Sequence, residues 1–157
     1  MRIRLAVALA LLAAGLLLVT CSPATDNGEP QPPEIAYGQD MCDACGMIID
    51  APKFAAATVL KNGEARKFDD IGDMLAFHMD HPDQQVQARF VHDYNTGKWI
   101  RAEKAFYVVS PSIASPMGHG FAAFGDKAAA AEFARRLGVD VLDFDQARLA
   151  AHVEVHG

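Results

Sequence analysis

The amino-terminal apolar run limits what the rest of this chain can fold into. Arg2 and Arg4 precede a segment from Leu5 to Val19 that contains only Leu, Ala, Val and one Gly. A helix needs about 20 apolar residues to span a bilayer, and this shorter segment is typical of a signal peptide. The sequence therefore predicts that residues 1–20 direct export and that the remainder forms one small domain outside the cytoplasm.

The end of this run predicts how the exported chain is held at a membrane. Leu18-Val19-Thr20-Cys21 resembles the lipobox of bacterial lipoproteins, with Thr20 in place of the usual Ala, Gly or Ser. Cys21 would then carry the lipid, and several acyl chains anchor a protein firmly. An uncleaved anchor is the alternative, and it also leaves the domain outside the cytoplasm. Residues 21–40 contain four of the eight prolines, which predicts a flexible tether.

Apolar runs after residue 40 predict an α+β domain built of two β-β-α-β units. Asn62-Gly63 is a strong hairpin signal, Asp69 or Asp70 can cap the first helix, and Gly138 can end the second. Strands are expected at residues 54–60, 64–68, 86–94, 105–110, 121–124 and 139–144, and helices at 70–81 and 126–137. The domain would cover residues 41–145. Residues 146–157 would form a frayed tail, in which His152, Glu154 and His156 leave a weak metal site open.

Charge and residue types exclude several functions. The net charge is −6, and the chain lacks the clustered Lys and Arg of a nucleic-acid-binding surface. The sequence also offers no paired nucleophile and general base. It therefore predicts a binding protein, with no catalytic residues and no nucleic-acid partner.

Cys42 and Cys45 form a C-x-x-C motif that several chemistries use. Haem attachment would need His directly after Cys45, where Gly46 stands. An iron–sulfur cluster usually needs four cysteines. A thioredoxin-type pair lies at a helix N-terminus, whereas Gly46 and Pro52 leave room for only a turn. A thiol-disulfide oxidoreductase is thus disfavoured, although it remains an alternative.

Two structural roles for the pair also stay open. A zinc-stabilised interaction module would need two more ligands, and His78 and His81 offer them at an unusually long separation from Cys45. A disulfide between Cys42 and Cys45 would close a very small loop, so it would add little stability.

The surrounding donors are rich in sulfur. Met41 and Met47 flank the cysteines, and Met117 lies in Ser115-Pro116-Met117-Gly118-His119-Gly120, which Gly and Pro make a loop. Thiolate and thioether ligands favour a soft ion such as Cu(I). The sequence therefore predicts that a loop methionine reaches the cysteines across a long separation in the chain.

These motifs together resemble the NosL family of copper-binding lipoproteins. The similarity extends from Cys21 to Leu137, and its motifs are Cys42-Asp43-Ala44-Cys45-Gly46-Met47, Phe68-Asp69-Asp70-Ile71-Gly72-Asp73-Met74, Asp93-Tyr94, Trp99, Ala105-Phe106-Tyr107-Val108, Ser115-Pro116-Met117-Gly118 and Ala123-Phe124. The resemblance implies a pair of β-β-α-β units and a Cu(I) chaperone on the periplasmic side of a membrane. It implies delivery of copper towards the copper–sulfide centre of nitrous oxide reductase, in denitrification, with ABC-transporter-type maturation proteins as further partners.

The resemblance also implies the metal ligands. Cys45 and Met117 are the expected copper ligands, and Met47 is the expected third. Cys42 would be a spare thiol or a transfer ligand. His119 would be a further nitrogen donor, although a solvated loop histidine is the simpler expectation.

Overall fold

The computed structural model describes residues 28–156, so the expected signal peptide and the lipidated Cys21 lie outside the described residues. The first unit forms a four-stranded antiparallel sheet in the order β2-β1-β3-β4, with α2 packed against β1 and β2. Its elements are β1 (Ala56–Leu60), β2 (Ala65–Phe68), α2 (Ile71–Asp80), β3 (Val86–His92) and β4 (Trp99–Arg101).

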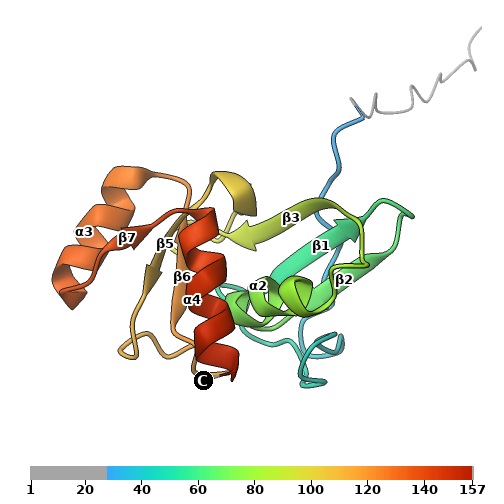
Figure 1. The fold of residues 1–157 in the computed structure, drawn as a ribbon, viewed down its shortest axis with the longest axis horizontal. Helices are drawn as coiled ribbons and strands as arrows, with labels where there is room; N and C mark the ends of the chain where they lie inside the picture. The colour runs from blue at the N-terminus through green and yellow to red at the C-terminus, as the bar shows by residue number, and fades with distance from the viewer. Residues whose placement is uncertain (1–27, 157) are drawn as a thin grey trace, which may run out of the picture.

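The second unit repeats this arrangement in a three-stranded sheet ordered β6-β5-β7. Its elements are the 3-10 helix η1 (Ala102–Lys104), β5 (Phe106–Val109), β6 (Phe121–Phe124), α3 (Lys127–Leu137), β7 (Val141–Leu142) and α4 (Phe144–His156). In both units the first strand lies between the second and the third. Figure 1 shows the two units side by side, with α4 lying along α2 where they meet. The predicted pair of β-β-α-β units in an α+β domain is confirmed.

The caps of both central helices follow the sequence signals. Asp70 caps α2 and accepts a hydrogen bond from the Gly72 N–H at 2.8 Å, and Asp126 caps α3 through the Ala129 N–H at 2.8 Å. Gly138 ends α3 in the left-handed conformation, with φ of 70°, which costs glycine no Cβ strain.

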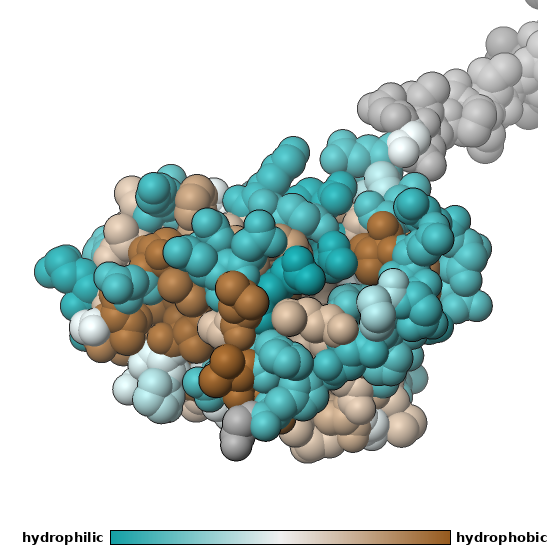
Figure 2. Space-filling model, viewed as in Figure 1, coloured by the Kyte–Doolittle hydropathy of each residue, from teal (hydrophilic) through white to brown (hydrophobic). Residues whose placement is uncertain are grey.

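The carboxyl-terminal end differs from the expected frayed tail, since residues 144–156 form α4. Ala147 and Ala151, four residues apart, are fully buried, so one side of α4 packs against the core. Leu149 and Val153 on the helix remain 65% and 66% exposed, and Figure 2 shows hydrophobic side chains over this region. The expected strand at 139–144 shortens to β7 because Phe144 already begins α4.

The amino-terminal limit of the packed domain also differs from the expectation. Ile35 is only 8% exposed and joins the hydrophobic core, and the Gly38 N–H donates to the Ile49 carbonyl. Packed structure therefore begins before the expected boundary at residue 41. Within residues 28–156, no helix has the length and apolar character needed to cross a membrane.

Candidate metal site

The cysteine motif forms a tight loop rather than a helix start. Met41 and Ile48 pair as an isolated antiparallel bridge, and the Cys42 N–H donates to the Met47 carbonyl at 2.8 Å. Gly46 has a φ of +73°, which an L side chain rarely adopts. The loop therefore turns back at Gly46 and leaves both thiols facing the N-terminus of α2.

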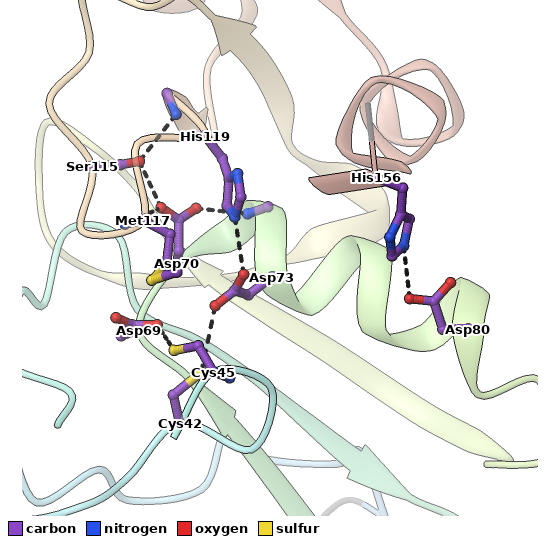
Figure 3. A network of polar contacts seen from close by, with 12 residues as sticks. Cys42, Cys45, Asp69, Asp70, Asp73, Asp80, Ser115, Met117, His119 and His156 are labelled. Carbon is purple, nitrogen blue, oxygen red and sulfur yellow. Dashed lines mark hydrogen bonds and ion pairs between the residues drawn. The ribbon is translucent and has the colours of Figure 1, made fainter. Parts of the chain in front are cut away.

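Each thiol meets a carboxylate of that N-terminus. The Cys45 Sγ donates to Asp69 Oδ1 at 3.3 Å, and the Cys42 Sγ donates to Asp73 Oδ2 at 3.6 Å. Donor atoms of these four side chains lie within 4.8 Å of one another. Cys42 and Cys45 are both free rather than joined in a disulfide. The loop and the helix thus bring two thiols and two carboxylates into one cluster (Figure 3).

Burial keeps the sulfur atoms of this cluster protonated. Cys42 is 3% exposed, and loss of solvation raises the pKa of its thiol. Burial also raises the pKa of Cys45, with a further increase from the neighbouring Cys42 and Asp69. Burial raises the pKa of the Asp73 carboxyl as well, against the opposing hydrogen bond from His119. Burial therefore favours the protonated thiol of both cysteines over the thiolate.

Asp70 joins the second unit to this cluster. Besides capping α2, its Oδ2 accepts a hydrogen bond from Ser115 Oγ at 2.6 Å and one from the Met117 N–H at 3.2 Å. Ser115 Oγ in turn accepts the Gly120 N–H at 3.0 Å. One buried carboxylate therefore holds the loop of residues 115–120 above the cysteine loop, and Met117 and Cys45 line the same groove of about 500 Å³.

His119 lies beside this groove and is bonded to the cluster. Its Nε2 is 3.0 Å from Asp73 Oδ1, and its side chain is 13% exposed. The ring also packs on Gly72, where a Cβ would lie 2.8 Å from the His119 Cβ. The expectation of a solvated loop histidine is therefore wrong.

The expected ligands divide into two groups in space. Cys45, Met117 and His119 line the groove, and Cys42 lies directly behind Cys45, with its Sγ 3.5 Å from the Cys45 backbone nitrogen. Met47 is 51% exposed and is not among the side chains that line the groove. Figure 3 shows the Met117 sulfur on the side of its loop that faces the thiols.

Asp69 and Asp73 belong to the cluster, although the sequence did not predict them as ligands. Asp69 was expected only as a possible helix cap, and Asp70 is the residue that caps α2 through its side chain. Their signal was the D-D-x-x-D spacing at a helix start, which gives no indication of which loop packs above it. The zinc alternative loses a proposed ligand, because His78 is buried and its Nε2 lies 2.9 Å from Thr58 Oγ1.

The fold and this cluster together define a class: a small α+β domain of two β-β-α-β units with a sulfur-containing candidate site for a soft metal ion. Within that class, the chain belongs to the NosL family, whose family model matches residues 34–151. Across 146 aligned residues it is 31% identical to the copper-binding lipoprotein NosL of Stutzerimonas stutzeri, and the alignment covers 87% of this chain and 75% of that protein.

A solved structure has a similar fold. The crystal structure of the copper chaperone NosL from Shewanella denitrificans matches with a TM-score of 0.65 and 24% sequence identity. The match covers 74% of this chain and 96% of the other.

Proposed function

We propose that this chain is a lipid-anchored Cu(I) chaperone on the periplasmic face of a bacterial membrane. It binds Cu(I) and passes it on for assembly of the copper–sulfide centre of nitrous oxide reductase, together with ABC-transporter-type maturation proteins. Family membership supports the copper, since a relative is named a copper-binding lipoprotein. The anchor rests on Cys21, and the acceptor rests on the family resemblance.

The observation that carries the proposal is the meeting of Cys45 and Met117 in one groove. Seventy-one residues of chain separate these two sulfur donors. Asp70 holds the Met117 loop over the start of α2, where Asp69 and Asp73 contact the two thiols of the cysteine loop. A thiolate and a thioether suit Cu(I), which accepts few ligands and prefers soft ones. Hard ions would prefer a set made mainly of oxygen ligands.

The proposed site combines fixed and exposed ligands. Cys45 and Met117 hold the ion, and Cys42, directly behind Cys45, is a spare thiol or a transfer ligand. Met47 is the third ligand, and its exposed position suits a donor that detaches when an acceptor approaches. His119 stays bonded to Asp73 and serves as a reserve nitrogen donor. The groove is open, so an acceptor ligand can attack the ion before the last donor releases it.

Copper entry displaces the thiol proton. Cys45 binds metal as a thiolate, and its proton leaves towards Asp69, which already accepts the S–H hydrogen bond. Binding and release proceed without covalent turnover. The raised thiol pKa values disfavour the oxidoreductase alternative, because a catalytic redox thiol needs a lowered pKa.

Anaerobic Cu(I) competition titration of the detergent-purified full chain tests the ligand assignment. Cys45→Ala and Met117→Ala should each weaken Cu(I) binding roughly a hundredfold, since loss of even an indirect ligand contact costs about 10–100-fold. Met41→Ala is the matched control, because Met41 is an exposed methionine of the same loop. Unchanged Cu(I) affinity in both ligand variants would refute the site.

The acceptor is tested in a cell that makes nitrous oxide reductase. Deleting the gene of this chain should leave the reductase with a deficit of copper and sulfide at its copper–sulfide centre. A gene that encodes the Met41→Ala variant should restore the normal content of that centre. If the Met117→Ala variant restored the content of the copper–sulfide centre as fully as Met41→Ala does, delivery through this site would be contradicted.

A further inference from the structure

A second group of donor atoms lies where α4 meets the end of α2. His152 and His156 are one helical turn apart on α4, with ring centroids separated by 4.8 Å. Asp80, the last residue of α2, faces both of them. Its Oδ2 is 2.9 Å from His156 Nε2, and its Oδ1 is 3.9 Å from His152 Nδ1. Figure 3 shows the His156 ring directed at the Asp80 carboxylate.

These spacings match the coordination shell of a transition-metal ion. Donor atoms of Asp80, His152 and His156 lie within 4.8 Å of one another. Metal–nitrogen and metal–oxygen bonds of about 2.0–2.2 Å place tetrahedral ligands about 3.4 Å apart and opposite square-planar ligands about 4 Å apart. The two histidine–aspartate distances lie on either side of 3.4 Å. An ion would therefore replace the existing hydrogen bond with only small side-chain rotations.

The position of α4 does not depend on these three polar side chains. Ala147 and Ala151 hold the helix against the core, whereas His152, His156 and Asp80 are all exposed. An exposed histidine–aspartate pair adds little stability. The backbone is thus already placed by packing, and three ligand side chains from two elements converge on a site open to solvent.

The ligand types differ from those of the cysteine cluster. Two imidazoles and a carboxylate suit borderline divalent ions, whose affinity rises through the first transition series to Cu(II). The Cys45–Met117 pair offers sulfur and suits Cu(I). Asp73 and Asp80 are seven residues apart on α2, which is about 10 Å along the helix. Asp80 also lines the groove that contains Cys45 and Met117.

We propose that Asp80, His152 and His156 form a second metal site, which binds a divalent transition-metal ion and prefers Cu(II). Solvent fills its remaining coordination positions. The groove then carries two copper sites of different ligand chemistry, a nitrogen–oxygen site at the end of α2 and a sulfur site at its beginning. This site is independent of the proposed Cu(I) function, because the two share no ligand.

Cu(II) titration with electron paramagnetic resonance tests the proposal on the detergent-purified full chain. The parent carries Cys42→Ser and Cys45→Ser, so that neither free thiol reduces the added Cu(II), and circular dichroism confirms that it folds. We expect one Cu(II) per chain with nitrogen hyperfine structure. His152→Ala and His156→Ala should each lower Cu(II) affinity at least about tenfold, since even outer-shell changes cost that much. Asp80→Asn should lower it in the same direction.

Two neighbouring side chains provide matched controls. His81→Ala removes an exposed histidine next to Asp80 whose ring stacks on Phe77, and Glu154→Gln removes a charge between the two histidines on α4. Both should keep the parental Cu(II) affinity. Parental affinity in His152→Ala and His156→Ala, or an equal loss in His81→Ala, would overturn the proposal.

A second measurement keeps the proposal testable if the parent without both thiols does not fold. Ni(II), which thiols do not reduce, is titrated into the chain with its cysteines intact. The double variant His152→Ala/His156→Ala should bind Ni(II) at least about tenfold more weakly, with unchanged Cu(I) affinity. Equal Ni(II) affinity in the unaltered chain and the double variant would overturn the second site. Failure of the unaltered chain to bind Cu(I) would instead contradict the proposed function.

Discussion

The two β-β-α-β units share a topology, yet their central helices have different roles. Asp70 and Asp126 cap α2 and α3 at matching positions. Asp126 is exposed and its side chain receives the Ala129 N–H. Asp70 is fully buried and its side chain receives hydrogen bonds from Gly72, Ser115 and Met117. The same cap thus builds a site in one unit because a loop of the other unit packs over it.

The helices also differ in how much of their surface is covered. α2 lies between its own sheet and α4, so most of its residues are buried, including Asp73 and His78. α3 buries only Ala130 and Ala134 and carries Arg135 and Arg136 near its end. Polar groups in the covered helix therefore contact other polar side chains, whereas those of α3 face water. The repeat supplies the scaffold, and the unequal covering determines where chemistry can occur.

Replacing the two cap residues should give the largest difference between the units in the free energy of unfolding that is lost. Asp70→Ala should lower the free energy of unfolding by about 3 kcal/mol, since it removes a cap and leaves buried donors without a partner. Asp126→Ala should cost only about 1 kcal/mol. Urea denaturation measures both. Equal losses would show that the contacts of Asp70 with Ser115 and Met117 add nothing to its cap.

Acidification should destabilise the first unit through His78. Burial lowers the pKa of His78 to about 4, against about 6.5 in an unfolded chain. The unfolded state binds the proton first, so stability is present above pH 6.5 and is lost as the pH falls towards 4. The loss from pH 7 to pH 5 should be about 2 kcal/mol.

The matching position of α3 holds Ala134, which does not titrate. His78→Gln should therefore flatten the stability change between pH 7 and pH 5 in urea denaturation. An unchanged slope in that variant would assign the pH dependence to other groups.

Cu(I) binding should become tighter as the pH rises, because the first unit supplies thiols whose pKa is raised. One thiol that loses its proton gives about a tenfold gain in affinity per pH unit, and two give about a hundredfold. Competition titration between pH 6 and pH 8 measures the slope. It also shows whether Cys42 binds with Cys45.

The second unit supplies a thioether, which does not titrate. Met117→Ala should therefore weaken Cu(I) binding and keep the same pH slope. A slope of zero in the unaltered chain would contradict thiolate binding.

Substitutions at the second residue after each cap should give the smallest difference in the free energy of unfolding between the two helices. Gly72 in α2 corresponds to Ala128 in α3, each two residues after its cap. Gly72→Ala should cost about 1–2 kcal/mol and displace His119, since its Cβ would lie 2.8 Å from the His119 Cβ. Ala128→Gly should cost at most about 1 kcal/mol.

Thermal unfolding measures these two costs, and histidine NMR signals report the His119 environment. If Gly72→Ala stabilises the chain, as alanine does in an open helix, the close contact with His119 is not rigid.

The local signals in the sequence predicted most of the fold. The Asn62-Gly63 turn, the aspartate caps and Gly138 depend on nearby backbone geometry, and each lies where it was expected. α4 was missed because Val153, Glu154 and Val155 alternate like a strand, while Ala147 and Ala151 are too small to give a strong helical period. β4 was missed because Trp99–Arg101 is very short and, within residues 28–156, pairs with β3 alone.

The candidate site was predicted only in part, because several of its contacts join residues that are far apart in the sequence. Sulfur donors are recognisable from residue type, so Cys45 and Met117 were identified. The carboxylates of Asp69 and Asp73 contact the thiols only through tertiary packing. A place at the start of a helix accounted for both residues without that contact. Likewise, the partner of His119 lies 46 residues earlier in the chain, beyond any local pattern.

The position of Asp70 between the two units has a consequence for the timing of cargo uptake. The amino-terminal unit alone would present two protonated thiols without the thioether of Met117, which arrives only with the loop of residues 115–120. Ligand binding that requires both units is coupled to completion of the tertiary structure. A half-folded chain therefore lacks the complete set of donors, and the finished domain acquires it in the same step that closes its core.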